Sequence, residues 1–445
     1  MRKLTVYIFI TAAVFYVSYG YAAYGEETLT WIECVKEARE NHPDLVSAEE
    51  KIREAEASRD ITVSAYLPRI NASASGESEK GSVFGGGGNT GIVPGGDRRG
   101  NTSGKWQNTY MYDIEGQQLL FDGFKTSYDI SAAGRNITSL IYNYDVISSD
   151  IRLRLRTAYV NLLSAQEFVS VAEEIKERRR RNLELVELRY EGGREHRGAL
   201  LTAEADLAQA DLDVTQSKRS IELAARQITK ELGRQVFTPM TAEGDFSVSE
   251  PERKEPDFEY LSDSNPFIRQ LVALKEAAKF GVRSAKAAFF PSIYATGSGG
   301  KTGTAMPPEN TDWALGVRLS FPIFEGGSRI AGVSKARAAL GRAGADERSG
   351  KDGVIYTMAA AWINLQDAVD NVGVRLKFLE ATKERARISE AEYSIGLLSF
   401  DNWIIIEDNL VSAEKNYISA RRDALIAEAQ WIQAKGGTLY YDQEK

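Results

Sequence analysis

Histidine, cysteine and methionine, the side chains that most often carry nucleophilic or transition-metal chemistry, are scarce in this sequence. Its 445 residues include two histidines (His42 and His196), one cysteine (Cys34) and five methionines. A copper or zinc relay needs more ligands than these, and a serine nucleophile needs a suitably placed base. The glycine run at residues 85–88 lacks the Gly-Lys-Ser/Thr ending of a phosphate-binding loop. The sequence therefore predicts no enzyme, no cofactor and no metal site.

Clustered charge is the chemistry that the sequence does offer. Four arginines are consecutive, namely Arg178, Arg179, Arg180 and Arg181. Such a run is most often a solvated helix face, and the functional alternative is that it pairs with acids of neighbouring helices or contacts a partner protein. The formal net charge of −8 and the isoelectric point near 5.3 argue against a nucleic-acid partner.

The arginine run belongs to a long segment, residues 125–190, that reads as one helix without proline. It carries two rows of small or apolar residues at seven-residue spacing. These rows are Leu155, Leu162 and Val169, and Ala158, Ala165 and Ala172. This spacing is typical of a coiled-coil seam, and a helix of this length would extend on the order of 100 Å.

The same pattern occurs twice in the chain. Residues 158–162 (AYVNL) return as residues 361–365 (AWINL), a displacement of 203, which also relates Gly193 to Gly396. Upstream, His42-Pro43 corresponds to Asn265-Pro266 with a displacement of 223. The difference of 20 residues indicates a tandem duplication in which the first copy has one enlarged loop. We expect a first repeat at residues 26–250 and a second at residues 251–445.

The first residues read as a secretory signal peptide, predicted over residues 1–25. Arg2 and Lys3 precede an apolar stretch at residues 4–19, followed by small residues. The alternative is an uncleaved membrane anchor. No cysteine follows directly, so no lipid anchor is expected.

Each repeat also contains two segments with alternating apolar and polar residues. The predicted strands cover about residues 66–78, 106–121, 289–300 and 311–324. The last has an apolar face of Trp313, Leu315, Val317, Leu319, Phe321 and Ile323. A soluble sandwich would show the same alternation, but export and aromatic ends favour membrane β-strands. Four strands cannot close a barrel in lipid, so several chains must share one.

Each long helix is followed by a turn and a returning helix. Tyr190 and Gly193 mark the first turn, and Tyr393 and Gly396 mark the second. The sequence thus predicts two long antiparallel helical hairpins with tips near residues 193 and 396.

Together these motifs resemble the TolC-like outer-membrane efflux proteins. The residues that carry the resemblance are 120–123 (LFDG), 158–162 and the two Tyr-x-x-Gly turns, in this order and duplicated. The LFDG segment and the missing lipid anchor are closer to the TolC and type I secretion branch than to the lipidated multidrug branch.

The resemblance implies a fold that is mainly α with membrane β. Each chain would supply four transmembrane strands and four tunnel helices to a homotrimer with a twelve-stranded barrel and a twelve-helix periplasmic tunnel. Such a protein sits in the outer membrane of a Gram-negative bacterium, in contact with lipid. It conducts drugs, small molecules or secreted protein passively, as the exit duct of a tripartite system with a periplasmic adaptor and an inner-membrane pump of the ABC or RND type.

The resemblance also points to candidate site residues near the hairpin tips. In the family, acids six and nine residues past the second tip glycine line a closed entrance. The matching positions here are Asn402 and Ile405, so the acids are missing. Asp401, Glu407 and Asp408 could form a displaced ring. Four further residues would contact the adaptor at the hairpin tips, Tyr190, Gly193, Tyr393 and Gly396, and the arginine run would supply gating charges.

A different class of protein also has long helical hairpins. The chain could be a periplasmic coiled-coil adaptor or scaffold of an export complex. Adaptors usually flank one hairpin with small β-domains, whereas here amphipathic strands precede both hairpins, which favours the channel.

Overall fold

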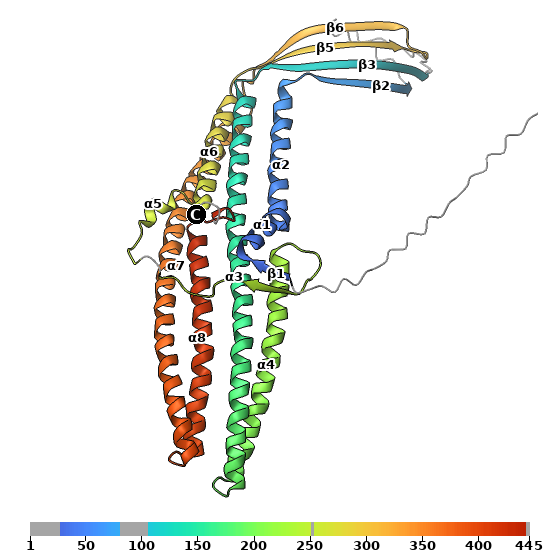
Figure 1. The fold of residues 1–445 in the computed structure, drawn as a ribbon. Coiled ribbons are helices and arrows are strands. Elements are labelled where there is room, and N and C mark those ends of the chain that lie inside the picture. Colours follow the sequence, from blue (N-terminus) through green and yellow to red (C-terminus); the bar gives the residue numbers. More distant parts are fainter. Residues whose placement is uncertain (1–26, 81–105, 251–252, 442–445) are drawn as a thin grey trace, which may run out of the picture. The chain divides into compact units, whose positions relative to one another are not determined.

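The computed structural model describes residues 27–80, 106–250 and 253–441 (Figure 1). The predicted signal segment and the whole of the glycine-rich segment at residues 81–104 lie outside these ranges. The helices are α1 (Trp31–Asn41), α2 (Pro43–Val63), the short 3-10 turn η1 (Ser64–Tyr66), α3 (Lys125–Glu191), α4 (Arg197–Glu231), α5 (Phe258–Ser262), α6 (Pro266–Ala287), α7 (Ser328–Ile395) and α8 (Phe400–Ala434). The strands are β1 (Glu27–Thr30), β2 (Arg69–Lys80), β3 (Trp106–Phe121), β4 (Met240–Glu243), β5 (Ser292–Gly303) and β6 (Asn310–Ser320). None of the described helices is both long and hydrophobic enough to pass through a bilayer.

The chain divides into two compact units, and each draws on both sequence repeats. One, the hairpin unit, comprises residues 1–40, 155–248 and 371–425. The other, the sheet unit, comprises residues 41–154, 249–370 and 426–445. The helices α3, α7 and α8 contribute residues to both units.

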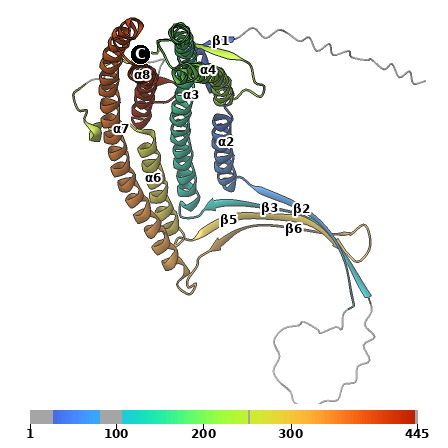
Figure 2. The same ribbon diagram turned by 90° about the horizontal axis from the view of Figure 1, so that it is seen from below.

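The sheet unit contains a four-stranded antiparallel sheet in the order β2-β3-β5-β6 (Figure 2). Its strands overlap all four ranges expected from the alternation. Two of them begin directly after a proline, at Arg69 and Ser292, and β6 ends at Ser320, earlier than expected. Pro322 explains the early end, because proline has no N–H to donate to a neighbouring strand.

One face of this sheet is apolar. Trp313, Leu315, Val317 and Leu319 of β6 are all at least 64% exposed and point to the same side. Opposite Trp313 and Leu315, β5 has Gly299 and Gly297, and a Cβ on Gly297 would lie 3.0 Å from the Leu315 side chain. The small residues of β5 therefore leave room for the large residues of β6.

The other face of the sheet is polar. Asp113 and Glu115 of β3 pair with Gly300 and Ser298 of β5, and Arg318 of β6 pairs with Tyr294. The sheet consequently has one face suited to hydrocarbon and one suited to water.

Helices α2 and α6 begin in the same way, which repeats the sequence correspondence in structure. His42 caps α2 through Nδ1, which accepts from the Asp44 N–H at 3.1 Å. Asn265 caps α6 through Oδ1, which accepts from the Phe267 N–H at 2.9 Å. Each cap is followed by proline at the first helical position, where a missing N–H costs nothing. His42 therefore has a structural role as a helix cap.

In the hairpin unit most of the predicted coiled-coil seam is buried, and Val169 is half-buried. Leu155, Ala158 and Leu162 of α3 are fully buried, and Ala165 and Ala172 nearly so. Small side chains in alternate positions let the helix backbones approach closely. Burial of this row removes apolar surface of α3 from water and so contributes to its packing in this unit.

A short parallel ribbon of β1 and β4 was not expected from the sequence. The Tyr159 hydroxyl donates to the Glu243 carbonyl at 2.6 Å and lies 3.2 Å from the Leu29 carbonyl, so it fastens both strands to α3. Burial raises the pKa of Tyr159 to about 12, which keeps its hydroxyl proton in place. Cys34 of α1 is also buried, and burial raises the pKa of its thiol to about 12. It is therefore an unreactive packing residue.

Candidate functional site at the ends of the helical hairpins

Both hairpins turn with a glycine in the left-handed region. Gly193 has φ = 66° and Gly396 has φ = 86°. Their N–H groups donate to the carbonyls of Tyr190 and Tyr393 at 2.9 and 3.0 Å. A residue with a side chain is strained at such φ values, which explains why the Tyr-x-x-Gly pattern predicted both tips.

The returning helix α4 begins at its own cap beside the first tip. His196 Nδ1 accepts from the Ala199 N–H at 3.0 Å. The ring is otherwise exposed at the surface. The second histidine is thus also a helix cap.

The two tip tyrosines have different environments. Tyr190 is 38% exposed, whereas Tyr393 is fully buried. The Tyr393 ring stacks on Trp403 with centroids 4.2 Å apart and an interplanar angle of 14°. Its hydroxyl donates to Glu195 Oε2 at 3.0 Å. Burial, followed by the bond to Glu195, raises the pKa of Tyr393, so the phenol stays protonated.

Arg189 completes the link between the two hairpins. Its Nη1 donates to the Tyr393 carbonyl at 2.7 Å, and its guanidinium lies 4.6 Å from the centre of the Tyr393 ring. Val186, Ala199, Ala203 and Phe400 pack with Tyr393 and Trp403 as one buried cluster. The tips therefore form a fixed structure with an aromatic core.

Two of the four arginines lie inside the hairpin unit and two lie on its surface. Arg178 makes a bidentate pair with Glu414 of α8 at 2.7 and 3.1 Å and lies 3.3 Å from Glu407. Arg180 and Arg181 are exposed, and Arg180 pairs with Glu177 of its own helix. Half of the run is therefore exposed to solvent, and the other half links α3 to neighbouring helices.

Arg179 joins three helices. It is 6% exposed, donates to Asp408 of α8 and lies 3.8 Å from Asp206 of α4. Burial raises the pKa of Asp206, although Arg179 opposes this. Breaking one partner of a buried pair is costly because it leaves the other charge without compensation.

Glu407 has the most enclosed carboxylate of this network. It is 2% exposed, and Asn182 donates to it at 3.3 Å. Burial raises the pKa of Glu407, and the nearby positive charge of Arg178 partly offsets this rise. The hypothesis that Glu407 contributes to a displaced ring at an open lumen does not fit this position, because the side chain is enclosed by its own chain.

The other candidate entrance residues lie on the outside of α8. Asp401, Asn402 and Ile405 are exposed, and Asp408 is exposed but paired with Arg179. Of these four residues, only Asp408 contacts the arginine run in the described structure, through Arg179. Sequence reasoning missed Glu414, Asn182, Glu195 and Arg189. The seven-residue spacing of Glu407 and Glu414 was a usable signal, because residues seven apart share a helix face.

No group of three or more His, Cys, Asp or Glu side chains within the described ranges is arranged to hold a metal ion. The arrangement at the hairpin ends can hold helices together through charge pairs and a buried aromatic cluster. Rearranging those pairs would change how the helices are held.

An amphipathic sheet together with long helical hairpins defines a class of exported channel proteins. Residues 34–234 and 260–437 match the model of the outer membrane efflux protein family. The chain belongs to this family. The family expected from the motifs is therefore confirmed, as is an outer-membrane location with the helical part in the periplasm.

Individual relatives are distant but extend over much of the chain. The outer membrane efflux protein BepC of Brucella suis is 23% identical over 349 residues, which are 77% of this chain and 70% of BepC. The alkaline protease secretion protein AprF of Pseudomonas aeruginosa is 23% identical over 238 residues, 52% of this chain and 49% of AprF. AprF supports the type I secretion branch favoured by the motifs.

The fold is shared with solved channel structures. Crystal structures of CusC, described for transmembrane channel formation, align with a TM-score of 0.78 at 18% identity and cover 91% of both chains. The matched family and these relatives are efflux and secretion proteins, which favours the channel class over the periplasmic adaptor.

Proposed function

We propose that this chain is one subunit of a homotrimeric channel-tunnel that conducts substrates passively out of the periplasm. The observation that carries the proposal is the four-stranded sheet, which has one exposed apolar face and, among the described residues, two unpaired edge strands, β2 and β6. Membership of the efflux family supports the general role of an exit duct.

The edges require other subunits. In hydrocarbon each unpaired backbone group costs several kcal/mol, so a sheet in lipid has to close on itself. Closed barrels in bacterial outer membranes start at about eight strands, which one copy of this sheet cannot supply. Three copies would give twelve strands, with β6 of one subunit paired to β2 of the next.

The hairpins would form the periplasmic part of the duct. Each subunit supplies four long helix segments in its hairpin unit, from α3, α4, α7 and α8. The pairs of Arg178 and Arg179 with acids of α8 and α4 would hold the hairpin ends in a closed arrangement. A periplasmic adaptor meeting the tips at Tyr190, Gly193, Tyr393 and Gly396 would release them, because packed helices can slide without losing their backbone bonds.

The energy source and cargo would belong to partners. An inner-membrane pump, of the ABC or RND type, would drive transport, as in the tripartite systems that the resemblance to the efflux family implies. The name of AprF favours secreted protein, and that of the fusaric acid resistance protein FusA of Burkholderia cepacia favours small molecules. Both remain candidates for this chain.

Single-channel conductance in planar bilayers tests the duct. We expect small, gated currents from the purified full-length protein. A permanently wide pore, or no pore, would contradict the proposal. In outer-membrane fractions we also expect a trimer that dissociates on heating.

Two variants of α8 separate a gate from an ion-binding ring. Asp408→Asn removes a partner of Arg179 and should raise the open probability several-fold. Asp401→Asn, an exposed control that makes no interhelical bond among the described residues, should leave gating unchanged and alter only cation preference. If both variants changed gating equally, the Arg179–Asp408 pair would not be what holds the channel closed.

A further inference from the structure

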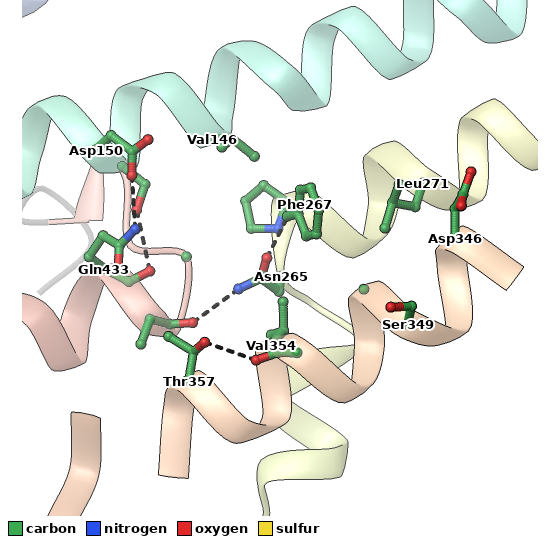
Figure 3. Close-up of a pocket in the computed structure, with 16 residues that line it drawn as sticks. Val146, Asp150, Asn265, Phe267, Leu271, Asp346, Ser349, Val354, Thr357 and Gln433 are labelled. Carbon is green, nitrogen blue, oxygen red and sulfur yellow. Dashed lines mark hydrogen bonds between the residues drawn. The ribbon is translucent and has the colours of Figure 1, made fainter. Parts of the chain in front are cut away.

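The sheet unit contains a cavity that shares no residue with the charge network at the hairpin ends. It measures about 660 Å³ and lies among α3, α6, α7 and the end of α8 (Figure 3). This volume is within the range of roughly 300–1,000 Å³ that is usual for small-molecule sites.

The cavity exists because glycines fix its walls. Gly436 follows α8 with φ = 83°, and a Cβ there would lie 2.4 Å from Pro266 Cδ, so only glycine lets the end of α8 meet the start of α6. Asn265 Nδ2 donates to the Ala434 carbonyl at 3.0 Å and secures this junction. On the opposite wall, a Cβ on Gly353 of α7 would meet nothing within 4 Å, so Gly353 leaves the space open.

The lining combines apolar surface with negative charge. Val146, Phe267, Leu271 and Val354 supply aliphatic and aromatic contacts. Two carboxylates also line the cavity, and no lysine, arginine or histidine does. Figure 3 shows them on different walls, Asp150 beside Gln433 and Asp346 near Leu271.

Both carboxylates belong to exposed residues. Asp150 Oδ1 accepts from Gln433 Nε2 at 2.8 Å, so its position is set by α8. Asp346 lies on the exposed side of α7. Because no basic side chain of the described residues lines the cavity, a positively charged group in it would be attracted by both carboxylates.

One feature of the cavity opposes this attraction. The start of α6 also lines it, and the amino end of a helix carries a partial positive charge of roughly half a unit. Its Phe267 N–H, however, is already satisfied by Asn265. Two full negative charges outweigh a partial charge that is capped.

We propose that this cavity binds an amphipathic organic cation, with an aromatic or aliphatic body against Phe267, Leu271 and Val354 and its charge attracted by the carboxylates of Asp150 and Asp346. The site goes beyond the exit-duct role, since binding here requires neither an open duct nor partner proteins.

Two ions of nearly equal shape and opposite charge test the site. Purified full-length protein is titrated by calorimetry with tetraphenylphosphonium and, separately, with tetraphenylborate, and protein-free micelles are subtracted. We expect saturable binding of one phosphonium ion per chain and no saturable binding of the borate.

Variants locate the binding. Asp346→Asn should weaken phosphonium binding about threefold to tenfold, because it removes one charge from a partly solvated cavity. Asp352→Asn is the matched control, since Asp352 is an exposed acid of the same helix that does not line the cavity. Gly353→Leu should abolish binding by filling the space.

The outcomes are decisive without the Gly353 variant. Weaker binding in Asp346→Asn but not in Asp352→Asn supports the site even if Gly353→Leu does not fold. Equal binding of both ions, equal affinity of wild type and Asp346→Asn, or no saturable binding at all overturns it.

Discussion

Tyr190 and Tyr393 occupy the same position in the two repeats, yet one is exposed and the other is fully buried. The sequence predicted both as tip residues, but it could not show which of the two would be buried. The difference arises from Trp403 and Glu195, which approach Tyr393 from α8 and from the turn of the other hairpin. A local repeat does not reveal contacts made between hairpins.

Substituting these tyrosines makes the first prediction. Tyr393→Phe leaves the nearly buried Glu195 carboxylate without its hydroxyl donor, so the tip should lose about 1–3 kcal/mol. Tyr190→Phe, the control from the other repeat, should cost little. Hydrogen exchange of the tip amides measures both. Similar exchange rates in the two variants would show that the Tyr393–Glu195 bond does not stabilise the tip.

Glu407 gives a prediction in pH. Its folded pKa is raised by burial, so its ionised form costs stability when the pH is well above that pKa. Glu407→Gln should therefore be neutral or mildly stabilising at pH 7–8. This advantage should shrink as the pH falls toward about 4.5, because wild-type Glu407 then takes up a proton.

Arg178→Gln is the contrasting variant for this measurement. It leaves Glu407 and Glu414 buried side by side without their cation, and should cost about 3–5 kcal/mol at pH 7. Thermal unfolding in detergent between pH 5 and pH 8 compares the three proteins. A Glu407→Gln variant that loses stability more at pH 8 than at pH 5 would mean that the ionised pair is net favourable.

At the scale of elements, the periodic spacing of apolar residues correctly predicted the long helices and the strands of the large sheet. The seam residues Leu155, Ala158 and Leu162 are buried, and the four alternating segments contain strands. The ribbon of β1 and β4 could not be predicted in this way. It consists of two four-residue strands that pair Glu27 with Met240, and such short segments carry no periodic signal.

The turns between strands and long helices make a prediction at this scale. Gly123 and Gly326 correspond in the repeats, with φ values of 70° and 60°. A Cβ on Gly123 would lie 2.4 Å from Phe290 Cβ and 2.9 Å from the Ala287 carbonyl, whereas one on Gly326 meets nothing within 4 Å. Gly326→Ala should cost about 1–2 kcal/mol from backbone strain alone. Gly123→Ala should cost about 1–3 kcal/mol more because it is also overpacked.

Thermal unfolding of the two glycine variants separates these causes, since they share the backbone strain and differ in crowding. Melting temperatures lowered equally would mean that α6 moves aside without cost. Gly353→Ala, in an open helical position, is a useful reference. It should raise stability by up to about 1 kcal/mol through helix propensity.

At the scale of the whole molecule, the main question is what the apolar face of the sheet contacts. A face with Trp313, Leu315, Val317 and Leu319 exposed is unfavourable in water and favourable in lipid. The polar face, with Asp113, Glu115 and Arg318, has the opposite preference. The alternation of apolar and polar residues predicted both faces. It could not predict how many chains share the sheet, because that number depends on how the edge strands pair, and alternation carries no information about pairing.

A lysine placed on either face decides between lipid and water. Leu315→Lys puts a charge on the apolar face and should cost about 2–4 kcal/mol near the bilayer centre. It should therefore reduce the heat-dissociable trimer in outer-membrane fractions. Ala314→Lys, one residue away and on the polar face, should assemble normally, because that face already carries Arg318 and meets water in the proposed barrel. If Leu315→Lys assembles as well as Ala314→Lys, the apolar face is not in lipid, and a shared barrel built from this sheet is excluded.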